Sequence, residues 1–304
     1  MFDSFIGNDQ LIDSIKSLVI SGKLPHGIVI QSEEGQGGGL FAMELAECYL
    51  EDNNQLVKRG IHPDCIVIEG SGISGDISVQ SVRDALYEAN KASVMTDGKR
   101  VILVKKAEHL NPSSSNALLK MLEEPPNGVI FVLTVKDKYD LLPTILSRVS
   151  VYHLQDLPIE KCAAEVCKNR EKCDMKTAMN YAEIFDGRYG LVLRAIDEPQ
   201  FASIAIGGKD FCRDALRSDL FGMLSHLSMA EDRDNLKDLL NACVLWLKGQ
   251  MREGVIESKK AEAVLDAVSK CYEDISKYVN IKLLQTRLAY ELIQYLGRIE
   301  IYGN

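Results

Sequence analysis

Long apolar runs are missing from this sequence. No stretch of about 18 uncharged apolar residues occurs in the 304-residue chain, so we expect no membrane-spanning helix. The first ten residues, MFDSFIGNDQ, also lack the positively charged start and the apolar segment of a secretory signal peptide. These two absences indicate a cytoplasmic protein.

An excess of positive charge is missing as well. The formal net charge is −9. Binding to the phosphates of a nucleic acid requires clustered Lys and Arg. The negative net charge therefore argues against nucleic-acid binding by the isolated chain. A local basic face stays possible on an assembly, and its candidates are Arg83, Lys91, Lys99 and Arg100. Charges around a helix more commonly form a solvated surface.

Cysteines at metal-ligand spacing are also absent. The eight cysteines are scattered singly, and the group nearest to such a spacing is Cys162, Cys167 and Cys173. A structural zinc site has four ligands and usually pairs its cysteines two to four residues apart. We therefore expect no metal site, and we expect reduced thiols that are buried or half-buried.

The character of the sequence changes near residue 153. Before this point, short β-branched runs alternate with helical patterns. The runs cover residues 27–31, 65–70, 100–105 and 129–134. Continuous apolar strands are typical of a parallel sheet covered on both faces, and the helical stretches between them suit βαβ crossovers. We predict a doubly wound α/β domain over residues 1–153.

No strand is predicted after residue 153. Residues 156–198 indicate short helices, and we expect a linker marked by Asp197-Glu198-Pro199 and by Gly207 and Gly208. Residues 209–298 carry long amphipathic patterns that predict an all-α domain over residues 201–304. These patterns contain stripes of apolar residues at helical spacing. Stripes of this kind pack more often inside one chain than at an interface. Their members include Leu239, Leu240, Cys243, Leu247, Leu283, Leu284, Leu288 and Leu292.

A glycine-rich loop follows the first predicted strand. The segment SEEGQGGGLFA, residues 32–42, lies where a phosphate-binding loop G-x-x-x-x-G-K-[ST] would lie, between a strand and a helix. Gly38 and Gly39 occupy the positions of the Lys and of the Ser or Thr, so no side chain reaches a terminal phosphate or holds Mg²⁺. The residues of this degenerate loop are Ser32, Gly35, Gly37, Gly38 and Gly39.

The segment NPSSSNALLKMLEEPP, residues 111–126, has the pattern of a capped amphipathic helix. Asn111-Pro112 favours a helix start, and Pro125-Pro126 favours its end. An apolar stripe at helical spacing runs between them. Packing of this helix on the sheet would explain the pattern without any function. We expect the neighbouring Glu123 and Glu124 to form a solvated edge.

The sequence of this segment nevertheless resembles a signature of bacterial AAA+ clamp-loader subunits, the DnaX and delta-prime proteins of DNA polymerase III. Other segments are similar to that family in the same order. They are LPH (24–26), HPD (62–64), ISVQSVRDAL (77–86), LLPTILSR (141–148) and, more distantly, FDGRYG (185–190) with the helix YVNIKLLQTRLAYEL. We expect His26 and His62, each next to a proline, to buttress loops.

The resemblance implies three domains. The first is a AAA+ domain over residues 1–153, with a P-loop NTPase-like parallel sheet that has helices on both faces. The second is a small α-helical lid over residues 154–200, and the third is an all-α collar for oligomerisation over residues 201–304.

The positions that carry ATPase chemistry in this family are altered. Lys105 and Lys106 stand where the ATPases have acidic residues after the third strand. An ammonium in place of a carboxylate inverts the local field and repels Mg²⁺. Lys136 occupies the polar sensor position, and Gly190 occupies the position of the lid arginine. The chain therefore resembles the delta-prime subunits, and we expect neither ATP hydrolysis nor a bound cofactor.

One departure concerns metal. Delta-prime proteins often carry a four-cysteine zinc module before the HPD segment, but residues 51–61 are too short for it and contain no cysteine.

Ser147 and Arg148 hold the remaining chemistry. In the family a Ser-Arg-Cys motif lies at a subunit interface, where its Arg enters the ATP site of the neighbouring motor subunit. The resemblance assigns this role to Arg148, with Ser147 at the interface, although Val149 replaces the Cys. The alternative is that Arg148 pairs with a carboxylate on its own surface.

The resemblance thus implies a stationary subunit of a bacterial clamp loader. Its partners would be DnaX-type motor subunits and the delta subunit in a hetero-pentamer, which loads the sliding clamp onto primed DNA. Two alternatives remain: a DnaX-like motor with an unorthodox ATP-binding loop, and a non-replicative AAA-like scaffold.

Overall fold

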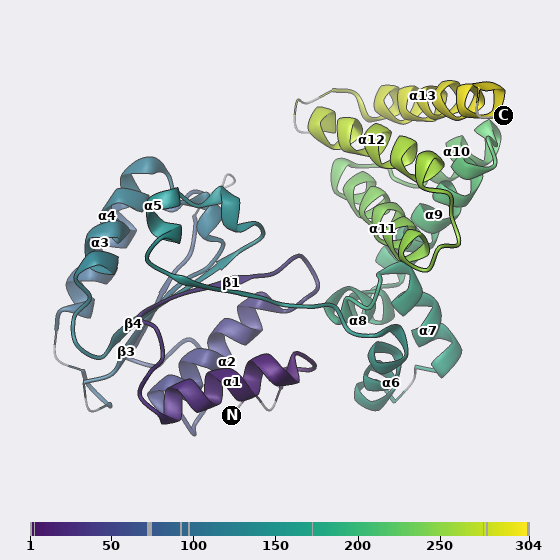
Figure 1. Ribbon diagram of the computed structural model, residues 1–304. Coiled ribbons are helices and arrows are strands. Elements are labelled where there is room, and N and C mark those ends of the chain that lie inside the picture. Colours follow the sequence, from purple (N-terminus) through teal and green to yellow (C-terminus); the bar gives the residue numbers. More distant parts are fainter. Residues whose placement is uncertain are drawn as a thin grey trace. The chain divides into compact units, whose positions relative to one another are not determined.

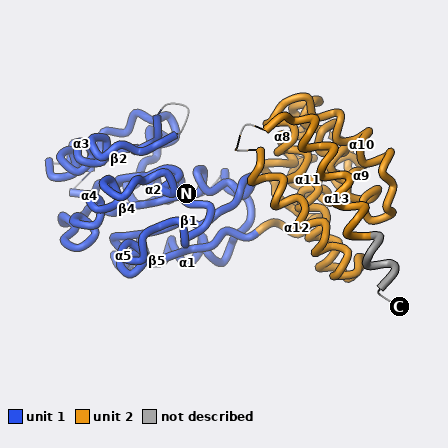
Figure 2. The backbone as a smooth tube through the Cα atoms, turned by 90° about the horizontal axis from the view of Figure 1, so that it is seen from above, with its two compact units in different colours: residues 1–155 blue, residues 156–304 orange. Residues whose placement is uncertain are grey.

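The computed structural model (Figure 1) describes the chain apart from residues 1, 3, 72–74, 92, 97, 172, 276, 278 and 303–304, with side chains placed up to residue 296. It contains two compact units, Met1–Gln155 and Asp156–Asn304 (Figure 2). The predicted domain borders at residues 153 and 200 stay predictions.

A five-stranded parallel sheet organises the first unit, with the strand order β2-β3-β4-β1-β5. The strands are β1 (Gly27–Gln31), β2 (Cys65–Ile68), β3 (Arg100–Val104), β4 (Val129–Val135) and β5 (Ser150–His153). The predicted runs correspond to β1 to β4. The prediction missed β5, a short edge strand with the sequence SVYH, which is not continuously apolar.

Helices cover both faces of this sheet (Figure 1). One face packs against α1 (Asp9–Ile20) and α2 (Gly38–Leu50), and the other packs against α3 (Val79–Ala89), α4 (Pro112–Glu123) and α5 (Pro143–Leu146). Alternate strand residues supply the two cores: Ile28 and Ile30 belong to the first, and Val29 belongs to the second. Burial on both faces explains the continuous apolar runs.

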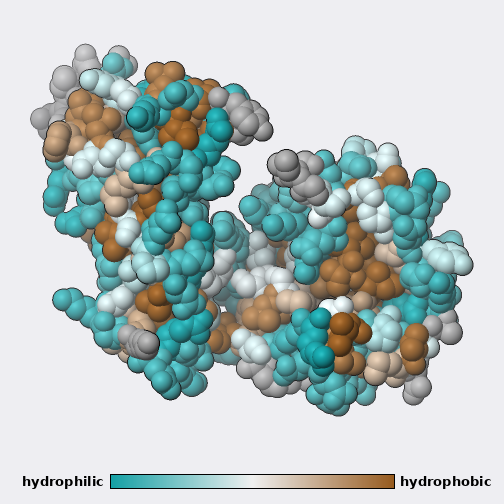
Figure 3. All heavy atoms as spheres, turned by 180° about the vertical axis from the view of Figure 1, so that it is seen from behind, coloured by the Kyte–Doolittle hydropathy of each residue, from teal (hydrophilic) through white to brown (hydrophobic). Residues whose placement is uncertain are grey.

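Helices joined by turns and short irregular segments make up the described residues of the second unit, and none of these residues lies in a strand. Its helices are α6 (Ile159–Asn169), α7 (Met175–Ile184), α8 (Tyr189–Asp197), α9 (Pro199–Leu216), α10 (Leu220–Leu227), α11 (Arg233–Arg252), α12 (Ser258–Ile275) and α13 (Ile281–Tyr302). Within the described part of the chain, no helix is long and apolar enough to cross a membrane. The face drawn in Figure 3 is largely hydrophilic and carries separate apolar patches.

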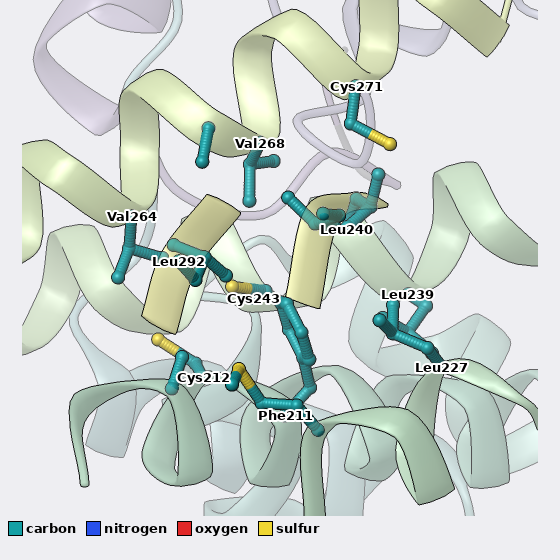
Figure 4. Packing of buried hydrophobic residues seen from close by; sticks show 14 of the residues in the cluster. Phe211, Cys212, Leu227, Leu239, Leu240, Cys243, Val264, Val268, Cys271 and Leu292 are labelled. Atoms are coloured by element: carbon teal, nitrogen blue, oxygen red, sulfur yellow. The ribbon is translucent and has the colours of Figure 1, made fainter. Parts of the chain in front are cut away.

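The core of the second unit gathers side chains from α9 to α13 (Figure 4). Phe211 and Cys212 of α9 lie in it with Leu239 and Cys243 of α11. The stripes found in the sequence are therefore mostly intramolecular core. Leu283 is the exception, because its side chain is 61% exposed.

The predicted linker at Gly207 and Gly208 was wrong. Both glycines are buried inside α9, against α11 and the segment that precedes it. A Cβ atom on Gly208 would lie 2.2 Å from the carbonyl oxygen of Leu239 and 3.0 Å from the Cβ of Ala242. Glycine is required here by the close approach of two helices, whereas the sequence pattern alone indicates a turn.

Candidate functional site

The glycine-rich loop connects β1 to α2, as predicted. Gly35 and Gly37 have φ angles of +87° and +81°, values at which a side chain would be strained. The backbone N–H of Ser32 donates to the carbonyl of Val135 at 2.9 Å, and the N–H of Glu33 donates to Oε1 of Gln36 at 2.7 Å. These glycines and hydrogen bonds form a tight turn between β1 and α2.

The position of the missing lysine is sterically closed. A Cβ atom on Gly38 would lie 1.8 Å from Oγ and 2.8 Å from Cβ of Ser32, so any side chain there requires Ser32 to move. Gly39, by contrast, faces open space. Ser32 thus occupies the place from which a lysine at residue 38 would extend.

The loop opens into a cleft of about 420 Å³. The structure brings the predicted Lys105, Lys106 and Lys136 together here, and Glu108 also lines the cleft. Nζ of Lys105 lies 3.3 Å from a carboxylate oxygen of Glu69. Other lining residues include Glu33, Glu34 and Thr134. Three ammonium groups, which repel Mg²⁺, thus line the cleft together with the carboxylates of Glu33, Glu34, Glu69 and Glu108.

One other predicted position lies away from the loop in the sequence. Gly190 is in α8 of the second unit. The eight cysteines, all among the described residues, are buried or half-buried, as the sequence predicts. Among the described residues, no group of three or more His, Cys, Asp or Glu side chains is arranged to hold a metal ion.

Arg148 follows α5 and is bound within its own chain. Its Nη2 lies 2.9 Å from Oε1 of Glu123, and its Nη1 donates to the carbonyl of Thr144 and to Oγ of Ser147, each at 2.9 Å. The intramolecular alternative considered for Arg148 is therefore present in the chain alone. Glu123, which we expected only at a solvated edge, is the partner.

Three of the recognised segments meet beside this pair. Nε2 of His26 lies 3.2 Å from the carbonyl oxygen of Leu122, near the end of α4, which confirms the buttressing role predicted for His26. A Cβ atom on Gly27 would lie 2.9 Å from Cγ1 of Val149 and 3.2 Å from Cδ2 of Leu122. Gly27 thus lets β1 approach both the α4 end and the residue after Arg148.

Sequence reasoning missed the roles of Gly27 and Glu123. A glycine that opens a β-branched run was a usable signal for Gly27, because such a residue commonly marks a close approach. No local signal identified Glu123, because its partner lies in another segment of the chain.

Comparisons with known proteins agree with the motifs. A family model described as "DNA polymerase III, delta subunit" matches residues 7–158. DNA polymerase III subunit delta' of Haemophilus influenzae is 31% identical over 185 residues, 57% of this chain and 55% of that protein. DNA polymerase III subunit tau of Escherichia coli is 29% identical over 172 residues, 53% of this chain and 26% of that protein. The chain thus spans about half the length of the first relative and about a quarter of the second.

Solved structures support the fold. A RuvB mutant from Thermotoga maritima is 14% identical, with a TM-score of 0.51, and the match covers 96% of this chain and 89% of that one. Together with the parallel sheet, this similarity confirms the predicted AAA+ fold class, followed by a helical C-terminal region. The matching model covers half of the chain, and the delta' and tau relatives are also named as subunits of DNA polymerase III. The chain belongs to the DNA polymerase III delta subunit family that this model describes.

Proposed function

We propose that the chain is a delta-prime-type subunit of a bacterial DNA polymerase III clamp loader. It acts as a stationary AAA+ member of a hetero-pentamer with DnaX-type motor subunits and a delta subunit. The complex uses ATP to load the sliding clamp onto primed DNA. In this complex the chain hydrolyses no ATP and supplies Arg148 to the ATP site of the neighbouring motor.

The geometry of the degenerate loop is the observation that carries the proposal. Ser32 fills the space next to Gly38, and Lys105 and Lys106 line the cleft at the positions where the ATPases of the family have acidic residues. Metal-assisted phosphoryl transfer depends on the bridging metal and on the lysine that contacts the terminal phosphates. A subunit without these groups contributes through its contacts with neighbours.

Arg148 has the chemistry for such a contact. Its side chain is 35% exposed, beside the exposed Ser147. A guanidinium presents a planar fork that binds phosphate oxygens in pairs, which an ammonium cannot do. An arginine supplied to a neighbouring site stabilises the charge of the transferring phosphoryl group, an effect of about 10³- to 10⁵-fold in rate.

The second unit is suited to a collar. Helices of the unit itself bury its apolar core. In addition, α13 presents apolar side chains to solvent. Leu283 is 61% exposed, and Tyr290, seven residues later on the same helical face, is 51% exposed. We assign this face of α13 to contacts with the other subunits.

A motor subunit is the second candidate, because the tau relative matches over half of the chain. The motor alternative requires the lone chain to bind Mg·ATP. The delta-prime alternative requires that the lone chain does not hydrolyse ATP.

The test is Arg148→Ala in a complex reconstituted with DnaX-type motors, delta, clamp and primed DNA. We expect the complex to assemble, as judged by native mass spectrometry, and turnover at the contacted site to fall by about 10³-fold or more. Arg59→Ala, at another exposed arginine, serves as the matched control and keeps the wild-type rate. An unchanged rate for Arg148→Ala refutes the assigned role, and ATP turnover by the lone chain favours the motor alternative.

A further inference from the structure

The guanidinium of Arg148 is already occupied before any neighbour is present. Nη1 donates to two neutral acceptors, the carbonyl of Thr144 and Oγ of Ser147. Nη2 faces the carboxylate of Glu123 at 2.9 Å. Both kinds of contact hold the side chain close to α5, so Arg148 must exchange at least one of them to reach a phosphate.

Glu123 is presented by a fixed scaffold. It is the last residue of α4, and Leu122, the residue before it, is buried against the sheet. The carbonyl of Leu122 is held by His26, and its side chain packs closely over Gly27. The carboxylate therefore starts from a defined position next to the Ser147-Arg148 segment.

The ion pair is also easy to open. The side chains of Arg148 and Glu123 are 35% and 49% exposed, so water and salt screen their attraction. An exposed pair of this kind shifts an equilibrium by about five-fold at most. A phosphate oxygen that approaches in the same plane offers the fork a charged acceptor of comparable geometry.

We propose that Glu123 is a latch for Arg148. It holds the guanidinium on its own subunit until the terminal phosphate of a triphosphate in the neighbouring subunit takes the place of the carboxylate. This inference rests on the proposed function, because it needs Arg148 to serve a site in trans. Glu123 is a positioning residue: it acts on the ATP concentration at which Arg148 engages, and it does not contact the nucleotide.

The two classes of contact define the exchange. The neutral contacts with Thr144 and Ser147 can persist when Nη2 changes its acceptor, because they use Nη1. The carboxylate and the phosphate compete for Nη2 alone. When the terminal phosphate is lost after hydrolysis, Nη2 of Arg148 returns to the carboxylate of Glu123.

Glu123→Gln tests the latch in the reconstituted complex. Glutamine keeps the shape of the side chain but removes the charge that competes with phosphate. We expect the half-saturating ATP concentration to fall by about two- to five-fold, with an unchanged maximal rate. Glu124→Gln is the matched control, because Glu124 is the neighbouring exposed carboxylate and makes no ion pair among the described residues; it should leave the ATP dependence unchanged.

A second measurement uses the lone chain and is independent of the complex. Phenylglyoxal modifies accessible arginines, and mass spectrometry of the peptides reports the extent at Arg148. We expect faster modification of Arg148 in Glu123→Gln than in the wild type or in Glu124→Gln, by a similar factor. Thermal unfolding of the three chains checks that the fold is intact.

The outcomes separate the two proposals. If Arg148→Ala leaves the rate of the complex unchanged, the role in trans fails. If Arg148→Ala lowers the rate but Glu123→Gln has the wild-type ATP dependence or a lower maximal rate, only the latch is refuted. Equal shifts in both glutamine variants also refute the latch, since they would reflect a general change of surface charge.

Discussion

At the residue scale, Asp64 shows why the HPD segment has its sequence. Its side chain is fully buried and accepts the backbone N–H groups of Val94, Met95 and Thr96. Nη2 of Arg100 lies 3.1 Å from the same carboxylate. The carboxylate thus fixes the connection between α3 and β3, and its neutralisation would leave several buried donors without a charged acceptor.

His62 supports the same segment. Its Nδ1 accepts the backbone N–H of Asp64 at 3.1 Å, so the loop-buttressing role predicted for His62 is confirmed. The sequence identified the segment, but it gave no sign that its aspartate binds a loop far along the chain.

Asp64→Asn should strongly destabilise the first unit. Burial raises the pKa of Asp64, but the N–H groups of Met95 and Val94 and the side chains of Arg100 and Thr96 outweigh it, so the pKa lies below its usual value. Its stabilising contribution is therefore present above the unfolded pKa of about 3.9 and is lost as the pH falls through the lower folded pKa.

We expect Asp64→Asn to lose about 3–5 kcal/mol at neutral pH, because Arg100 keeps a buried charge without its partner. The difference from wild type should narrow below about pH 4. Urea unfolding at several pH values measures the difference in the free energy of unfolding between the variant and the wild type. Asp13→Asn, at an exposed residue, is the control. A difference that stays constant down to acidic pH would contradict the role of the ionised carboxylate.

The candidate site was predictable where its chemistry lies in one segment. Gly38, Lys105 and Arg148 could be identified because each occupies a fixed place relative to a strand or a motif. The partner of Arg148 could not be predicted in this way. Glu123 and Glu124 are chemically equivalent in the sequence, and only the end of α4 decides which of them faces the guanidinium.

At the element scale, the same local pattern produced correct and incorrect predictions. The strands β1 to β4 could be predicted because burial on both faces makes their sequences continuously apolar. The edge strand β5 has half-buried residues and no such signal. A pair of glycines occurs both in linkers and at tight contacts between helices. The local sequence does not show that α11 packs against α9, so the linker prediction for Gly207 and Gly208 was wrong.

The two glycines of α9 provide a matched pair. Alanine favours a helix interior over glycine by about 1 kcal/mol, so the intrinsic gain is the same at both positions. At Gly208 a Cβ would meet the fixed carbonyl of Leu239 at 2.2 Å, whereas at Gly207 it would meet the flexible side chain of Met229 at 3.2 Å. The surroundings of each glycine therefore decide whether its substitution by alanine stabilises or destabilises the unit.

We expect Gly208→Ala to destabilise the second unit by about 1–3 kcal/mol or more, because α9 and α11 must separate. Gly207→Ala should be close to neutral or slightly stabilising. Thermal unfolding of the two variants provides the comparison. Equal melting temperatures would mean that the contact between α9 and α11 is looser than the described one.

At the scale of the whole molecule, the apolar stripes of the second unit divide into core and surface. Leu284, Leu288 and Leu292 of α13 are buried in the core that also holds Leu239 and Leu240 of α11. Leu283 points the other way, although it belongs to the same run in the sequence. Helical periodicity alone could not separate the buried leucines of α13 from the exposed one. The packing of α13 against the other helices decides which of its faces is exposed.

The outward face of α13 yields the prediction at this scale. If it contacts the other subunits, Leu283→Glu places an unpaired carboxylate in an apolar interface, and we expect assembly with the motor and delta subunits to weaken by about ten-fold or more. The melting temperature of the lone chain should change little, since the side chain is 61% exposed there. Lys282→Glu, at the adjacent exposed position, makes a larger charge change without loss of apolar surface and should assemble nearly normally. Titration by analytical ultracentrifugation compares the two variants. Equal weakening by both would identify a charge effect, and no weakening by either would remove this face of α13 from the collar interface.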